Sequence, residues 1–86
     1  MGTVIIDVRE PAEYARGHVG SAVNIPLNEL ANRSNKLDNI SKNTKLVVYC
    51  QSGNRSNLAL KILNSLGYTN LVNGINQATV ETNYLF

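Results

Sequence analysis

Two short apolar runs constrain the fold of this 86-residue chain more than any other feature. The runs 3–8 (TVIIDV) and 45–50 (KLVVYC) are rich in β-branched residues, and the second is apolar at each position from 46 to 49. Runs of this length and composition are typical of strands that are covered on both faces, as in parallel sheets. Segments with helical signals lie between and after them, so the sequence predicts alternating strands and helices.

The signals outside these two runs locate the other elements. Pro11 suits the first turn of a helix, Gly17 suits its end, and Gly67 suits the end of a later helix. The predicted elements are a helix within 10–17, a strand at 21–26, a helix from Leu27 to Leu37, a helix from 54 to 66, a short strand around Leu71 and Val72, and a weakly helical tail from Ile75 to Phe86.

This alternation predicts an α/β fold. Successive strands should pair in parallel through right-handed crossovers. We therefore expect a small three-layer domain with a mainly parallel sheet of about four strands and helices on both faces. The chain is long enough for one domain and too short for two, so residues 1–86 are expected to form a single domain.

Composition argues against several classes of function. The basic residues are scattered around a net charge of +2, so nothing indicates nucleic-acid binding. One cysteine and one histidine argue against a zinc site within the chain. No apolar run approaches the roughly 18–20 residues of a membrane span, and no signal peptide is recognised. We expect a cytoplasmic location, or a periplasmic one if the chain is a processed mature domain.

Cys50 stands where the second apolar run meets the polar loop 51–54 (QSGN). In open parallel sheets ligands bind beyond the carboxyl ends of the strands, so Cys50 falls at the ligand-binding edge. A helix that begins near Asn54 would point free N–H groups at the loop, Gly53 permits a turn that gathers amides, and Arg55 adds positive charge. These features lower the pKa of a thiol, so we predict that Cys50 is a nucleophile.

Other interpretations of the loop stay open on the residues alone. Cys50 could be a small apolar residue at a strand end. A cysteine-dependent phosphatase or arsenate reductase uses the same physics with a longer spacing, but only Gln51 to Asn54 separate Cys50 from Arg55, and the next position is Ser56. A module that keeps the fold for binding or for redox sensing is the non-enzyme alternative.

Separate motifs carry a resemblance to a known family. The stretch 7–26 (DVREPAEYARGHVGSAVNIP), followed by 47–56 (VVYCQSGNRS) and 66–74 (LGYTNLVNG), resembles a single-domain rhodanese over most of the chain. The resemblance implies a sulfurtransferase that moves sulfane sulfur, through a cysteine persulfide, from a donor such as thiosulfate to cyanide or a thiol. The acceptor thiol can belong to a protein, and neither a metal nor an organic cofactor is implied.

The resemblance also implies roles for individual residues. Cys50 is the nucleophile and persulfide carrier, and Arg55 helps to bind the anionic donor. The cradle of the persulfide is made by the backbone amides of Gln51, Ser52, Gly53, Asn54 and Arg55.

The chain departs from the family pattern in three places. The loop carries Gln51, Ser52 and Asn54 where many members carry a further basic residue. The local positive charge is therefore lower, and thiosulfate is expected to bind weakly. The family's usual strand before 3–8 is lacking, so a smaller sheet is expected. Asn73-Gly74 and the letters INQAT replace a double glycine and a tryptophan, so the far wall of the pocket is expected to differ.

Asp7 and Arg9 are expected to support the site. Asp7 should lie near Cys50 in a structural role and accept bonds from loop amides, because a carboxylate beside a thiolate would raise the thiol pKa. Arg9 either lines the pocket or pairs with Glu13 on the surface, and the surface pair is favoured here. His18 follows a helix end, where histidine can satisfy terminal carbonyls, so a cysteine–histidine dyad is not expected.

Overall fold

A computed structural model describes residues 2–84 of the chain. Its four strands form one sheet, all parallel, in the order β2-β1-β3-β4. The elements are β1 (Val4–Asp7), α1 (Pro11–Ala15), β2 (Val23–Asn24), α2 (Leu27–Ala31), the 3-10 helix η1 (Asn35–Leu37), β3 (Leu46–Tyr49), α3 (Asn54–Ser65), β4 (Leu71–Ile75) and α4 (Gln77–Asn83).

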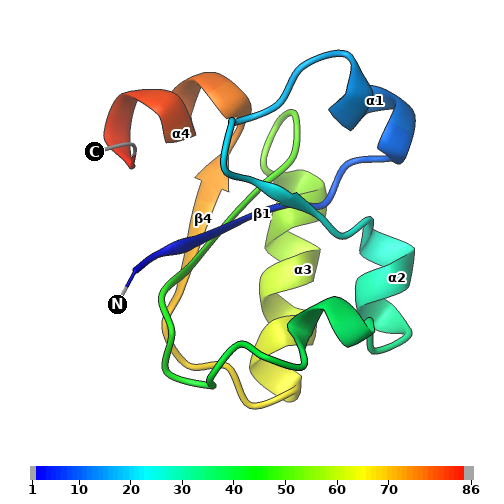
Figure 1. Cartoon of the computed structure of the whole chain (residues 1–86), viewed down its shortest axis with the longest axis vertical. Coiled ribbons are helices and arrows are strands. Elements are labelled where there is room, and N and C mark those ends of the chain that lie inside the picture. The colour runs from blue at the N-terminus through cyan, green and yellow to red at the C-terminus, as the bar shows by residue number, and fades with distance from the viewer. Residues whose placement is uncertain (1, 85–86) are drawn as a thin grey trace.

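Helices cover both faces of this sheet, with α2 and α3 on one side and α4 on the other (Figure 1). Successive residues of a strand point to opposite faces. Ile6 and Val48 accordingly pack in the core under α3, whereas Ile5 and Val47 pack in the core with Val80 of α4. The predicted α/β fold, with a parallel sheet of four strands between two helical layers, is confirmed.

Strand β3 lies at the centre of the sheet and sets the position of Cys50. All four of its residues are fully buried, and it pairs with β1 on one side and β4 on the other. Cys50 follows directly and is also buried. In the register, Asp7 at the end of β1 lies opposite Tyr49 at the end of β3, so both carboxyl ends reach the same edge.

An irregularity in β4 shapes the neighbouring part of that edge. One extra residue, Gly74, lies opposite the junction of Val48 and Tyr49. A Cβ on Gly74 would lie only 2.6 Å from a methyl carbon of Val80, so the close packing of α4 requires glycine there. The next residue, Ile75, takes a φ of 74°, which is strained for a β-branched side chain.

The helix predicted from Leu27 to Leu37 is wrong in its second half. The α-helix stops before Arg33, which takes a φ of 60°, and only a short 3-10 helix follows. The side chain of Ser34 accepts a hydrogen bond from the backbone N–H of Lys36 at 3.1 Å. A serine that bonds nearby backbone in this way competes with a continuous helix, which explains the break.

The C-terminal tail is helical, as predicted, over the residues of α4. The side chain of Asn76 caps this helix by accepting from the backbone N–H of Thr79 at 2.8 Å. Ile75 belongs to β4 instead, so the last strand is longer than predicted. Residues 85–86 lie outside the described residues.

Candidate active site

The sulfur of Cys50 occupies the place of a side-chain cap at the start of α3. The N-cap residue is Gly53, with a φ of 94°, and glycine has no side chain that could accept from the first-turn amides. The Cys50 Sγ accepts instead from the backbone N–H groups of Gly53 at 3.2 Å and Ser56 at 3.4 Å. Free amides and the positive end of the helix dipole therefore converge on the sulfur.

These contacts make the thiol acidic. Burial raises the pKa of Cys50, but hydrogen bonds outweigh this effect and lower the pKa from the usual 9.0 to about 7. The bonds come from the Ser56 hydroxyl and from the amides of Ser56, Ser52 and Gly53. About half of the molecules then carry the reactive thiolate at neutral pH.

The Ser56 hydroxyl connects Cys50 to β4. The thiol donates to Ser56 Oγ at 3.6 Å, and the hydroxyl donates to Asn73 Oδ1 at 2.6 Å. Asn73 also donates through Nδ2 to the Gly53 carbonyl at 3.2 Å, so it ties the loop to the sheet. An ionised thiol can no longer donate to Ser56, and the hydroxyl stabilises the thiolate by turning toward the sulfur.

Sequence reasoning missed both Ser56 and Asn73. The signal for Ser56 was present in the chain, because a helix whose N-cap is glycine leaves its third amide without a side-chain acceptor. Asn73 had no local signal, since its contact with Ser56 spans 17 residues and depends on how β4 lies against α3.

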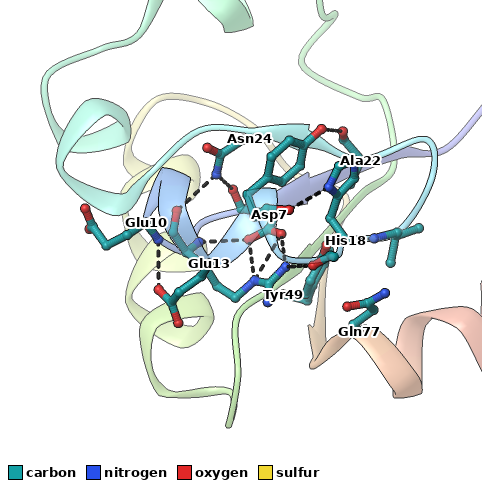
Figure 2. Close-up of polar contacts among 12 residues, drawn as sticks. Asp7, Glu10, Glu13, His18, Ala22, Asn24, Tyr49 and Gln77 are labelled. Carbon is teal, nitrogen blue, oxygen red and sulfur yellow. Dashed lines mark hydrogen bonds and ion pairs between the residues drawn. The ribbon is translucent and has the colours of Figure 1, made fainter.

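Asp7 and Arg9 form a buried ion pair at the same edge, where Figure 2 shows the bonds that converge on Asp7. The carboxylate accepts from the backbone N–H of Arg9 at 2.9 Å and from its Nε and Nη2 at 3.0 and 2.7 Å. Arg9 Nη2 also donates to the Gly17 carbonyl at 2.8 Å. The hydrogen bonds to Asp7 raise the pKa of Arg9. The backbone amide from which Asp7 accepts is thus that of Arg9, two residues further along the chain.

The predicted surface pair between Arg9 and Glu13 is wrong. Residues two apart on an extended chain point to the same side, so Asp7 is the nearer partner of Arg9. Glu13 instead binds Arg55 through two bonds, from Nη1 to Oε1 at 2.7 Å and from Nη2 to Oε2 at 3.0 Å. The bonds from Arg55, with a smaller effect of the Glu10 amide, lower the pKa of Glu13 to about 2.

In this second pair, Glu13 binds the guanidinium of Arg55, which the family resemblance assigns to the anionic donor. Both Nη atoms of Arg55 are bound to the carboxylate of α1. The side chain of Arg55 is 34% exposed and that of Glu13 is 21% exposed, so the pair is far less buried than that of Asp7 and Arg9.

Two adjoining hollows open beside Cys50, and we call them together the mouth. Their volumes are about 540 and 220 Å³, and Arg9, Gln51 and Gln77 line both. The larger hollow is also lined by Cys50, Ser52, Asn76 and Ala78, and the smaller by Glu13, Arg16 and Gly17. The far wall is therefore the start of α4, within the segment whose letters INQAT depart from the family pattern. Gly53, Asn54 and Arg55 line neither hollow.

His18 takes the expected structural role. Its Nδ1 lies 2.7 Å from the Tyr14 carbonyl at the end of α1, and its ring stacks on that of Tyr14 at 3.6 Å. Within residues 2–84, no three His, Cys, Asp or Glu side chains gather as metal ligands. Over the same residues, no helix has the length and apolar character needed to cross a membrane.

Comparison with curated proteins identifies sulfurtransferases among the relatives of this chain. The thiosulfate sulfurtransferase PspE of Escherichia coli is 43% identical over 68 residues, which cover 79% of this chain and 64% of that protein. A sulfurtransferase of Allochromatium vinosum is 34% identical over 70 residues, which cover 81% of this chain and 63% of that protein. The chain therefore spans less than two thirds of the length of these relatives.

Solved structures and a family model agree with this comparison. A rhodanese from Escherichia coli, solved with anions, superposes with a TM-score of 0.80 at 35% identity over 91% of each chain. A human single-domain sulfurtransferase superposes with a TM-score of 0.75 at 30% identity over 92% of this chain and 81% of that one. The family model described as the rhodanese-like domain matches residues 1–78. The chain therefore belongs to the rhodanese-like domain family.

Proposed function

We propose that this chain is a sulfurtransferase domain in which Cys50 carries sulfane sulfur as a persulfide. The observation that best supports the proposal is the pair of N–H bonds from Gly53 and Ser56 to the Cys50 sulfur. These donors stabilise a thiolate before the reaction, and in this proposal the amides of residues 51–55 hold the second sulfur bonded to Sγ.

The proposed reaction has two steps. In the first, the Cys50 thiolate attacks the outer sulfur of a donor such as thiosulfate; a new S–S bond forms, the donor's S–S bond breaks, and sulfite leaves with the electron pair. In the second, cyanide or a thiolate attacks the outer sulfur of the persulfide and restores the Cys50 thiolate. Negative charge develops at the same place in both steps, where the start of α3 can stabilise it.

The polar residues around the loop divide into two roles in this proposal. Arg9 lines the hollow of Cys50 and is the guanidinium that an anionic donor meets there, while Asp7 holds it in position. Arg55 does not contact the donor in this proposal, because its guanidinium is bound to Glu13; it holds the Glu13 carboxylate in place.

Intact-mass measurement after incubation with thiosulfate tests the proposal. Cys50 is the one cysteine of the chain, so a gain of one sulfur atom that cyanide removes reports its persulfide. The Cys50→Ala variant, which lacks the nucleophile, should show no gain. Absence of any gain with thiosulfate and with other sulfane donors, together with hydrolysis of an aryl phosphate, would refute sulfur transfer in favour of the phosphatase alternative.

A further inference from the structure

Glu13 lines the smaller hollow of the mouth, whereas its partner Arg55 lines neither hollow. Figure 2 shows Glu13 beside the α1 backbone, where its carboxylate accepts from the Glu10 N–H at 3.0 Å. Two bonds from Arg55 hold the same carboxylate in place. A donor that enters the smaller hollow therefore lies beside an ion pair whose negative member lines the hollow and whose positive member does not.

The other charges at the mouth add little net attraction for a doubly charged anion beside Cys50. Arg9 is the cation that lines the hollow of Cys50, and its charge is offset by the buried carboxylate of Asp7. Arg16 lines only the smaller hollow, where Glu13 carries the opposite charge. The nucleophile itself is an anion once the Cys50 thiol has ionised. Each further negative charge on a donor adds repulsion from this thiolate and from Glu13.

We propose that Glu13 determines the class of donor, by selecting against dianionic donors such as thiosulfate and favouring sulfane donors of lower charge. Thiosulfonates and hydropersulfides belong to the favoured class. The inference deepens the proposed function and rests on it, because it concerns the donor step of the same Cys50 persulfide.

The donor step balances for a hydropersulfide, R–S–SH. The Cys50 thiolate bonds to the outer sulfur, the R–S to S bond breaks, and R–S⁻ leaves with the electron pair while the proton stays on the transferred sulfur. The reacting groups carry a single negative charge in total, whereas a thiolate and thiosulfate together carry three. The electrostatic repulsion between the donor, the thiolate and Glu13 is correspondingly smaller.

A pair of donors that differ in charge and little in shape isolates this effect. Methanethiosulfonate has a methyl group where thiosulfate has one of its anionic oxygens, so it carries one negative charge fewer. We would measure kcat/KM for both donors and follow their ratio across variants, which cancels the intrinsic reactivity of each donor. In Glu13→Gln the ratio of thiosulfate to methanethiosulfonate should rise about fivefold, because one repelling charge is lost.

Two further variants separate charge from structure. Arg55→Gln leaves the Glu13 carboxylate uncompensated, so the ratio should fall about fivefold. The double variant Glu13→Gln/Arg55→Gln restores the original net charge and should return the ratio close to that of the parent. Glu29→Gln is the matched control, since it removes a carboxylate paired with Lys36 at 3.4 Å that lines neither hollow, and its ratio should not change.

A variant in which the two charged residues exchange places serves as the test if Arg55→Gln fails to fold. Glu13→Arg/Arg55→Glu keeps an ion pair but puts the guanidinium at the mouth, so the ratio should exceed that of the parent. A ratio that stays constant in all variants, with both donors loading Cys50, would overturn donor selection and leave the sulfurtransferase intact. If neither donor adds sulfur to the parent chain, the proposed function fails and this inference fails with it.

Discussion

Two carboxylate–guanidinium pairs lie at the edge of the sheet where Cys50 lies, and they differ in sequence separation and in burial. Asp7 and Arg9 are two residues apart, and their side chains are 0% and 8% exposed. Glu13 and Arg55 are 42 residues apart, join α1 to α3 and are partly open to solvent. The first pair can form wherever this stretch is extended, whereas the second forms only after the domain has folded.

The difference in burial decides how much each ion pair contributes to the stability of the fold. A buried charge that loses its partner keeps the full cost of its desolvation, while an exposed pair is screened by water and salt. The pair of Asp7 and Arg9 should therefore dominate stability. Changes to the pair of Glu13 and Arg55 should cost little stability. The pair can therefore serve the role in donor selection that we propose.

The largest expected effect comes from breaking the buried pair. Asp7→Ala leaves Arg9 without its carboxylate and should lower the free energy of unfolding by about 3–5 kcal/mol. Urea denaturation followed by circular dichroism measures this change. Asp7→Leu/Arg9→Met, which removes both charges, should recover much of the lost stability. A cost below about 1 kcal/mol for Asp7→Ala would show that the pair contributes no more than an exposed ion pair does.

The second effect tests whether neutral donors, rather than either ion pair, set the acidity of the thiol. Ser56→Ala removes one of the hydrogen bonds that lower the pKa of Cys50, so that pKa should rise by about one unit. Alkylation at pH 7 should slow about fivefold because the thiolate fraction falls from about half to about a tenth.

Ser52→Ala is the matched control for this measurement. Ser52 acts on the thiol through its amide, which the substitution retains, so the rate profile against pH should stay that of the parent. If Glu13→Gln shifted the pKa of Cys50 more than Ser56→Ala did, the exposed ion pair would be the main determinant of acidity instead.

The smallest effect concerns the stability of the exposed pair and its dependence on pH. Glu13→Gln should cost about 0.5–1 kcal/mol at pH 7. The pKa of Glu13 is lowered from 4.5 to about 2, so its stabilisation is complete above 4.5 and is lost as the pH falls toward 2. Thermal unfolding of both proteins between pH 7 and pH 2 checks this, and a constant difference in Tm over that range would contradict it.

Local patterns were sufficient to predict the position of Cys50 and the backbone amides around its sulfur. The apolar run before it predicted a central strand, and the glycine and helix signals after it predicted converging amides. The same kind of reasoning failed for the helix from Leu27 to Leu37, where hydrophobic spacing continued but the Ser34 side chain caps a separate turn. Spacing reports which side chains share a face, and it does not report a local hydrogen bond that interrupts the helix.

By itself, the sequence determined the order of strands and helices along the chain and the placement of Cys50 at the carboxyl end of the central strand, because both follow from periodicity and turn chemistry within short segments. Only the tertiary structure decided that Arg55 binds Glu13 and that Asn73 holds Ser56. Each of these contacts joins residues distant in the chain, so it depends on how the crossovers bring α1, α3 and β4 together at one edge of the sheet.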